Sequence, residues 1–190
     1  VREVVAQKTS GNDIKNVIFL NADIFQDPCK NAFFDYVWCS GVLHHTKDPQ
    51  KGFEIISNWV KPNGLIIIGL YNNIGRLRTN FRQLIYKLMG KSKIAKKLVY
   101  ILDPHLRKKL NDTKKNAWFR DQYEHPVESK HSIDEVIKWF DKNSVDFLGS
   151  IPSTNLEDNV KIKEMDGDRG SILSRIYTQI MMLFSPSGAE

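Results

Sequence analysis

The chain has 190 residues, of which 41% are hydrophobic and 26% are charged, and its formal net charge is +6. This is the composition of one globular domain with a sizeable core. It excludes a wholly disordered chain, and 11 Gly and 7 Pro exclude a collagen-like or Pro/Gly-rich one. No apolar run is long enough to be a transmembrane segment, and Cys29 and Cys39 are too few for a disulfide framework, so the composition favours a cytoplasmic protein.

Strands and a helix alternate in the first part of the chain, after a short helix that we expect over residues 2–7. The nearly all-apolar runs 16–21, 34–39 and 65–70 are typical of strands buried on both faces. Between the last two runs, Asp48 is placed as an N-cap and Pro49 as the first residue of a helix, which the turn at 62–64 ends. The order strand, helix, strand predicts a βαβ unit with a parallel sheet, and hence an α/β fold.

The second part of the chain is predominantly helical. Helices are predicted over residues 76–88, 95–102, 106–110, 132–141 and 172–184, with one further strand over 145–151 and polar loops over 117–131 and 155–171. The first of these helices is amphipathic, with an apolar side made of Leu77, Phe81, Leu84, Ile85 and Leu88. Ser132 and Glu135 have the spacing of a capping box at the start of helix 132–141.

The positive charge is concentrated in one segment. Residues 75–120 contain 14 Lys and Arg but only two acidic residues, Asp103 and Asp112. Such a segment can attract nucleic acid, anionic lipid or a phosphorylated substrate. The alternative is a solvated face on helices that also pack a core, because lysine is mostly found at protein surfaces.

Polar residues follow each predicted strand. Asp23 follows the first run, residues 40–45 (Ser-Gly-Val-Leu-His-His) follow the second, and Tyr71-Asn72-Asn73 follows the third. Ligands of open parallel sheets bind at the carboxyl ends of the strands. The sequence therefore predicts a small-molecule site at this edge of the sheet.

These motifs, in this order and spacing, resemble those of the class I S-adenosylmethionine-dependent methyltransferases. The resemblance covers residues 1 to about 73 and is carried by Asn21-Ala22-Asp23, the run 34–45, Asp48-Pro49 and the run 60–69. It implies a Rossmann-like parallel sheet with flanking helices, S-adenosyl-L-methionine as cofactor, and methyl transfer to an acceptor.

The resemblance also assigns cofactor contacts to individual residues. Asp23 matches the acidic residue that accepts a hydrogen bond from the adenine amine, and Ile24 would supply a backbone amide to the ring. Ser40 and Gly41 match the loop beside the methionine part of the cofactor. Leu43 matches the wall between cofactor and substrate.

His44 and His45 match the same wall and are the candidate catalytic residues. Imidazole titrates near neutrality, so either side chain can act as a general base. A metal role is not expected, because two ligands on a helix need the His-x-x-x-His spacing. The alternative is that the pair is structural, with one ring hydrogen-bonded and the other in solvent.

Residues 118–131 resemble part of a less well characterised group of bacterial methyltransferases. Together with the exit of the third strand, this segment supplies the candidate substrate-binding residues, which are Tyr71, Asn72, Arg120, Tyr123 and His125. The alternatives are a strand-exit turn at Tyr71 and a lid-like segment that packs on the core.

Two features of the family are missing from the chain, the glycine-rich loop after the first strand and the acidic residue after the second. Those glycines let the backbone approach the cofactor closely. We therefore expect a fragment that is truncated before Val1 and also after Phe184, and that holds the cofactor poorly and is inactive by itself. The expected organisation is a partial methyltransferase core over 1–74, a basic helical cap over 75–131, and a C-terminal part of the core over 132–190.

Three functions are compatible with these patterns. The first is methyl transfer to a small-molecule acceptor beneath the helical cap. The second is an RNA methyltransferase, with the basic segment 76–120 on the phosphates, since the tRNA wobble-uridine methyltransferases also resemble the sheet motifs. The third is a non-catalytic methyltransferase-like binding protein.

Overall fold

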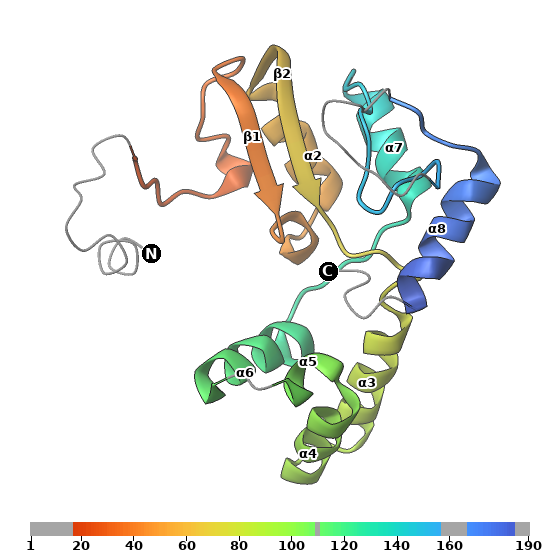
Figure 1. Ribbon diagram of the computed structural model, residues 1–190. Helices are drawn as coiled ribbons and strands as arrows, with labels where there is room; N and C mark the ends of the chain where they lie inside the picture. The colour runs from red at the N-terminus through yellow and green to blue at the C-terminus, as the bar shows by residue number, and fades with distance from the viewer. Residues whose placement is uncertain (1–16, 109–110, 157–166, 185–190) are drawn as a thin grey trace.

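The computed structural model describes residues 17–108, 111–156 and 167–184. Its centre is a sheet of two parallel strands, β1 (Phe34–Ser40) and β2 (Val60–Gly69), joined by helix α2 (Pro49–Asn58), as Figure 1 shows. Asp48 caps α2 by accepting a hydrogen bond from the Lys51 amide at 2.9 Å, with Pro49 in the first turn. The predicted βαβ unit and its helix start are confirmed, although β2 begins at Val60 and includes the residues expected to form a turn.

One face of the sheet is covered and the other is open among the described residues. Val37 and Cys39 of β1 pack with Ile66 and Ile68 of β2 on the covered face, against α2 and α7 (Ile133–Lys142). We call this set the first cluster; its fully buried members include Leu43, Phe53 and Ile56. On the other face Tyr36 and Trp38 are 46% and 66% exposed.

A second hydrophobic cluster holds the helices that follow β2 together. These elements are α3 (Leu77–Leu88), α4 (Lys93–Leu102), α5 (Pro104–Arg107), α6 (Asp112–Phe119) and the π-helical turn η3 (Arg120–Glu124). The second cluster consists of Tyr86, Ala95, Val99, Leu106, Phe119 and Tyr123. In Figure 1 these helices lie below the sheet, and the chain then returns to α7 and to α8 (Ile172–Phe184) beside it. The division into segments 1–74, 75–131 and 132–190 stays a prediction.

The predicted first strand does not form. Of residues 16–21 the structure describes 17–21, which belong to no strand, and Ile18 is 92% exposed. Because β1 pairs only with β2 among the described residues, the run has no place in this sheet.

Two other expectations between residues 117 and 151 are also wrong. Residues 145–151 form no strand, because the Val145 amide caps α7 by bonding the Phe140 carbonyl at 3.0 Å and Phe147 packs against Phe140. Residues 117–124 are helical rather than a loop, and their helix buries Phe119 and Tyr123, which are four residues apart.

The remaining helices form close to their predicted positions. Helix α3, α4, α7 and α8 agree with the predictions within about two residues, whereas the helix expected at 106–110 is the short α5, which begins at Pro104. The apolar side of α3, however, faces solvent, while Thr79 and Tyr86 face inward. The helix expected at 2–7 lies outside the described residues. None of the helices within the described ranges is long and apolar enough to cross a membrane.

Candidate active site at the carboxyl ends of the strands

The residues that follow β1 and β2 meet at one edge of the sheet. Gly41 leaves β1 with a φ of +75°, and its amide donates to the Gly69 carbonyl at 3.2 Å. The turn η2 (Leu43–His45) then carries the two histidines, and Tyr71 follows β2. The rings of His44 and Tyr71 stack with centroids 3.8 Å apart, so the two strand exits are in direct contact.

His44 is enclosed. It is 2% exposed, and neither of its ring nitrogens has a hydrogen-bond partner among the described residues. Burial, and then the neighbouring charge of His45, lowers the pKa of His44 to about 4. Its ring is therefore neutral at physiological pH.

His45 has the surroundings of a proton acceptor. Its Nδ1 lies 2.9 Å from the Val127 carbonyl, and a carbonyl only accepts, so Nδ1 carries the hydrogen and Nε2 carries the lone pair. The Asp121 carboxylate lies 3.8 Å from Nε2. The His45 side chain is 15% exposed and that of Asp121 is 47% exposed, so solvent reaches this pair.

His125 and Tyr71 complete the surroundings of His45. The His125 ring lies 3.8 Å from the His45 ring and donates through Nδ1 to the same Val127 carbonyl, at 2.7 Å. The Tyr71 hydroxyl lies 3.5 Å from the Asp121 carboxylate and accepts from Gln122 Nε2 at 3.0 Å. The structure thus brings together four residues of the predicted site, His44, His45, Tyr71 and His125.

Sequence reasoning missed the buried ion pair beneath this site. The Arg76 guanidinium lies 3.8 Å from the centre of the Tyr71 ring and 3.1 Å from the Glu128 carboxylate, and it also bonds Gln122. Arg76 is 1% exposed. In the sequence Arg76 stands out only as a member of the basic segment, and its place five residues after Tyr71 is the signal that links it to the strand exit.

The other three substrate-binding candidates are placed differently. The Asn72 amide is used within the protein, since it donates to Gln179 at 2.9 Å and accepts from the Ile74 and Gly75 amides. The Tyr123 hydroxyl donates to Asp103 at 2.7 Å within the second cluster. Arg120 is exposed at the start of η3.

The cofactor-binding candidates divide into exposed and buried groups. Asp23 is exposed and caps the short turn η1 (Ile24–Gln26) by accepting from the Phe25 amide at 3.0 Å, whereas Ile24 packs against the first cluster. Leu43 is fully buried in that cluster. Ser40 ends β1 with its side chain against Gly69.

Two of the cofactor-binding candidates, Asp23 and Gly41, are open to a ligand, whereas Leu43 is not. Nothing lies within 4 Å of where a Cβ on Gly41 would be, so a ligand can approach the backbone there. The exposed Asp23 carboxylate can accept a hydrogen bond from an exocyclic amine. Among the described residues no cluster of His, Cys, Asp or Glu has the geometry of a metal site.

Comparisons with known proteins agree with the resemblance of the sheet motifs. Residues 1–68 match the family model described as "Methyltransferase domain", which confirms the similarity of this part to class I S-adenosylmethionine-dependent methyltransferases. The chain is also 26% identical over 132 residues to an uncharacterized protein of Synechococcus sp., an alignment that covers 61% of this chain and 32% of the relative. The chain thus spans about a third of the length of the curated relative that it matches.

Proposed function

We propose that this chain is part of a cytoplasmic S-adenosylmethionine-dependent methyltransferase that acts on a small polar molecule. The observation that carries the proposal is the meeting of His45, Asp121, Tyr71 and His125 at the carboxyl ends of β1 and β2. The match of residues 1–68 to a methyltransferase domain supports the reaction class.

The cofactor site in this proposal uses Asp23, Ile24, Ser40 and Gly41. When bound, S-adenosylmethionine supplies an electrophilic methyl group. Transfer of such a group needs little covalent help, so the protein contributes mainly by holding the acceptor in line, an effect of about 7–11 kcal/mol. The exposed His125 ring, 3.8 Å from the His45 ring, is the surface that supplies that positioning in this proposal.

His45 removes the acceptor proton in this proposal. Its Nδ1 hydrogen is held by the Val127 carbonyl, which leaves the lone pair on Nε2, 3.8 Å from the Asp121 carboxylate. His44 does not take this role, because a buried ring with a pKa of about 4 is a weak base. It supports Tyr71 by stacking instead.

The test uses the full-length protein that contains this chain. The readout is formation of S-adenosylhomocysteine when a pooled small-metabolite fraction is added, with cofactor binding followed separately by calorimetry. His45→Gln should lower turnover about 10²–10⁴-fold and leave the affinity for S-adenosylmethionine unchanged. His105→Gln, a histidine stacked on Trp118 in the helical cap, is the matched control and should keep turnover. Equal turnover by wild type and His45→Gln would contradict the role of His45.

The RNA methyltransferase alternative is favoured by one observation, the basic segment 76–120. It predicts turnover with a tRNA fraction rather than with metabolites, and RNA affinity that falls steeply with salt. A full-length protein that binds no S-adenosylmethionine would instead favour the non-catalytic binding protein.

A further inference from the structure

Helix α3 turns an apolar stripe toward solvent. Leu77, Phe81, Leu84 and Leu88 recur at spacings of four, three and four residues, which places them on one side of the helix. They are 50%, 63%, 51% and 77% exposed. Four large side chains at this exposure are not needed for the second cluster, which α3 joins through Tyr86 on its other side.

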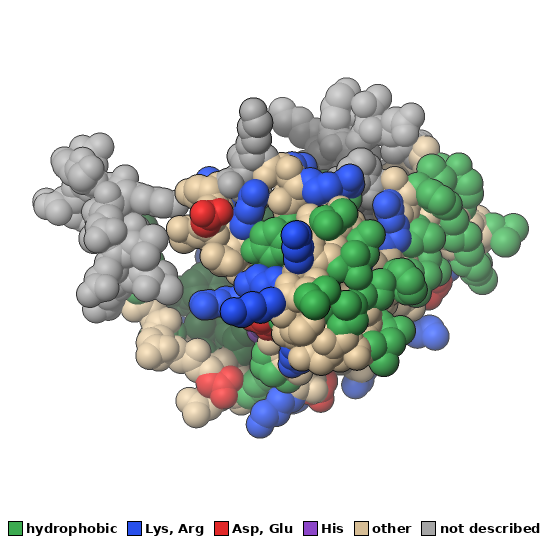
Figure 2. Space-filling model, turned by 90° about the horizontal axis from the view of Figure 1, so that it is seen from below, with side chains coloured by type: hydrophobic (Ala, Val, Ile, Leu, Met, Phe, Trp, Pro, Cys, Tyr) green, Lys and Arg blue, Asp and Glu red, His purple; other side chains and the backbone are tan. Residues whose placement is uncertain are grey.

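Basic side chains flank this stripe and continue along α4. Residues 77–102 contain seven Lys and Arg and no Asp or Glu. On α4 the exposed Ile94 and Ile101 are seven residues apart, with the exposed Lys93 and Lys97 beside them. Figure 2 shows hydrophobic side chains gathered on the lower face of the molecule, with Lys and Arg among and beside them.

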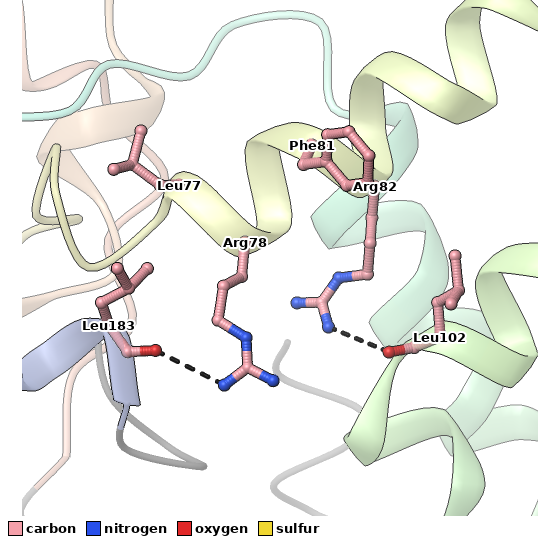
Figure 3. Close-up of a pocket in the computed structure, with 6 residues that line it drawn as sticks. All are labelled: Leu77, Arg78, Phe81, Arg82, Leu102 and Leu183. Carbon is pink, nitrogen blue, oxygen red and sulfur yellow. Dashed lines mark hydrogen bonds between the residues drawn. The ribbon is translucent and has the colours of Figure 1, made fainter.

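A hollow of about 370 Å³ connects the stripe with the ends of α4 and α8. Its walls are Leu77, Phe81, Leu102 and Leu183, together with two arginines, Arg78 and Arg82. As Figure 3 shows, the guanidiniums extend toward main-chain carbonyls, Arg78 to Leu183 at 3.4 Å and Arg82 to Leu102 at 3.3 Å. Arg82 also donates to the Thr79 hydroxyl at 2.8 Å, and each guanidinium still has further donors. The aliphatic walls suit hydrocarbon.

We propose that the outer face of α3 and α4, with this hollow, binds the surface of a bilayer that contains anionic phospholipids. The apolar stripe enters the boundary between headgroups and acyl chains, and the lysines and arginines contact headgroup phosphates. This combination of an apolar side with basic flanks and no acidic residue is that of an interfacial helix. The proposal does not depend on the proposed methyltransferase activity.

Two other occupants explain less of this face. Single-stranded nucleic acid is held by basic residues with aromatic stacking, and the stripe offers three leucines and one aromatic ring. A second copy of the chain would bring the same positive charge against this face and be repelled. An anionic bilayer accounts for both the aliphatic side chains and the positive charge.

The test is co-sedimentation of the whole chain with phosphatidylcholine vesicles, with and without about one third phosphatidylglycerol. Wild type should bind the anionic vesicles and bind neutral vesicles at least tenfold more weakly. Lys87→Gln and Lys97→Gln each remove one exposed positive charge. Each should lower the affinity for anionic vesicles about fivefold. Leu84→Ser combined with Leu88→Ser should lower it at least tenfold.

Trp38→Ser is the matched control, because it removes an exposed side chain from the open face of the sheet instead. It should leave vesicle binding unchanged, and circular dichroism should show that every variant is folded. Binding that depends on the lysines but not on the leucines, preferential binding of a tRNA competitor, or dimerisation through the leucines would each overturn the proposal.

Discussion

His44 and His45 are adjacent in the chain but have opposite surroundings. His44 is enclosed between Tyr71 and the first cluster, while His45 faces Asp121 and solvent. The His44 ring is therefore held neutral, while the His45 ring lies beside a carboxylate and solvent. The spacing of the two residues could not have shown this difference, because it depends on which ring the turn η2 directs inward.

The enclosure of His44 should make stability pH-dependent. Its pKa is about 4 in the folded chain and 6.5 ordinarily, so between these values the unfolded chain binds a proton that the folded chain does not. The stability that the neutral His44 ring contributes is therefore fully present above pH 6.5 and is lost as the pH falls from 6.5 toward 4. His44→Phe, which keeps an aromatic ring against Tyr71, should remove roughly 2–3 kcal/mol of the stability loss between pH 7 and pH 4.5, measured by urea denaturation. A variant that loses as much stability as wild type over this range would show that His44 is not the source.

The Arg76–Glu128 ion pair should dominate the stability of the site. Burial favours the neutral form of Glu128, but the Arg76 charge and the Lys130 contact outweigh it and lower its pKa below the ordinary 4.5. Arg76→Gln should cost about 3 kcal/mol at pH 7, because it breaks a buried ion pair and leaves Glu128 with Lys130 alone as its counterion. The difference in unfolding free energy between wild type and Arg76→Gln should become smaller as the pH falls below 4.5 and Glu128 is protonated. Chemical denaturation measures both effects, and Arg78→Gln, an exposed arginine two residues away, should cost less than about 1 kcal/mol.

Among the helices after β2, one carboxylate ties several elements together. Asp103 is 2% exposed and accepts from the His105 amide at 2.8 Å, from the Trp118 indole at 3.2 Å and from the Tyr123 hydroxyl at 2.7 Å. Burial alone would raise its pKa, but these hydrogen bonds lower it below 3.8, so the group stays ionised. It joins the end of α4 to α5, α6 and η3.

Asp103→Ala should therefore loosen the whole group of helices. With three donors left without a partner, we expect a loss of about 3 kcal/mol or more in the free energy of unfolding. Denaturation followed by Trp118 fluorescence measures it. Asp112→Ala, an exposed acid in the first turn of α6, should cost less than about 1 kcal/mol. Similar losses in the two variants would contradict the central position of Asp103.

Local signals predicted the helices better than the strands. The caps Asp48 and Ser132 form the expected hydrogen bonds, since an N-cap depends only on residues within one turn. The runs 16–21 and 145–151 carry the composition of strands but form none within the described residues, because a strand also needs a neighbour of suitable register. The sequence also could not predict that the apolar side of α3 faces solvent. Periodicity shows which residues share one side of a helix, but not whether that side contacts protein or solvent.

The candidate site was predictable where residues follow a strand directly. His45 and Tyr71 were found in this way, because parallel strands end at the same edge. Asp121 and Glu128 lie about fifty residues further along and reach the site through the fold of α6 and η3. Their positions depend on the second cluster, which no local pattern in the sequence reveals.

At the scale of the whole molecule, the two hydrophobic clusters share no member. The connections between them are the segments that follow β2 and η3, with polar contacts such as His45–Asp121 and Asn72–His131. Polar contacts of this kind couple the unfolding of the two clusters less strongly than a continuous apolar core would. We therefore expect the segment 75–131 to open as a unit distinct from 1–74 and 132–190.

A pair of cavity-forming substitutions tests this division. Leu106 is 2% exposed in the second cluster, and Ile56 is 1% exposed in the first cluster. Leu106→Ala and Ile56→Ala should each lower the free energy of unfolding by about 2–5 kcal/mol. Hydrogen exchange measured by mass spectrometry should then rise in α4 and α6 for Leu106→Ala while α2 and α7 keep their protection, and the reverse should hold for Ile56→Ala. The two variants are controls for each other, since they remove side chains of similar size. If each substitution raised exchange equally in both clusters, the chain would unfold as one cooperative unit and the boundaries at residues 74 and 131 would be wrong.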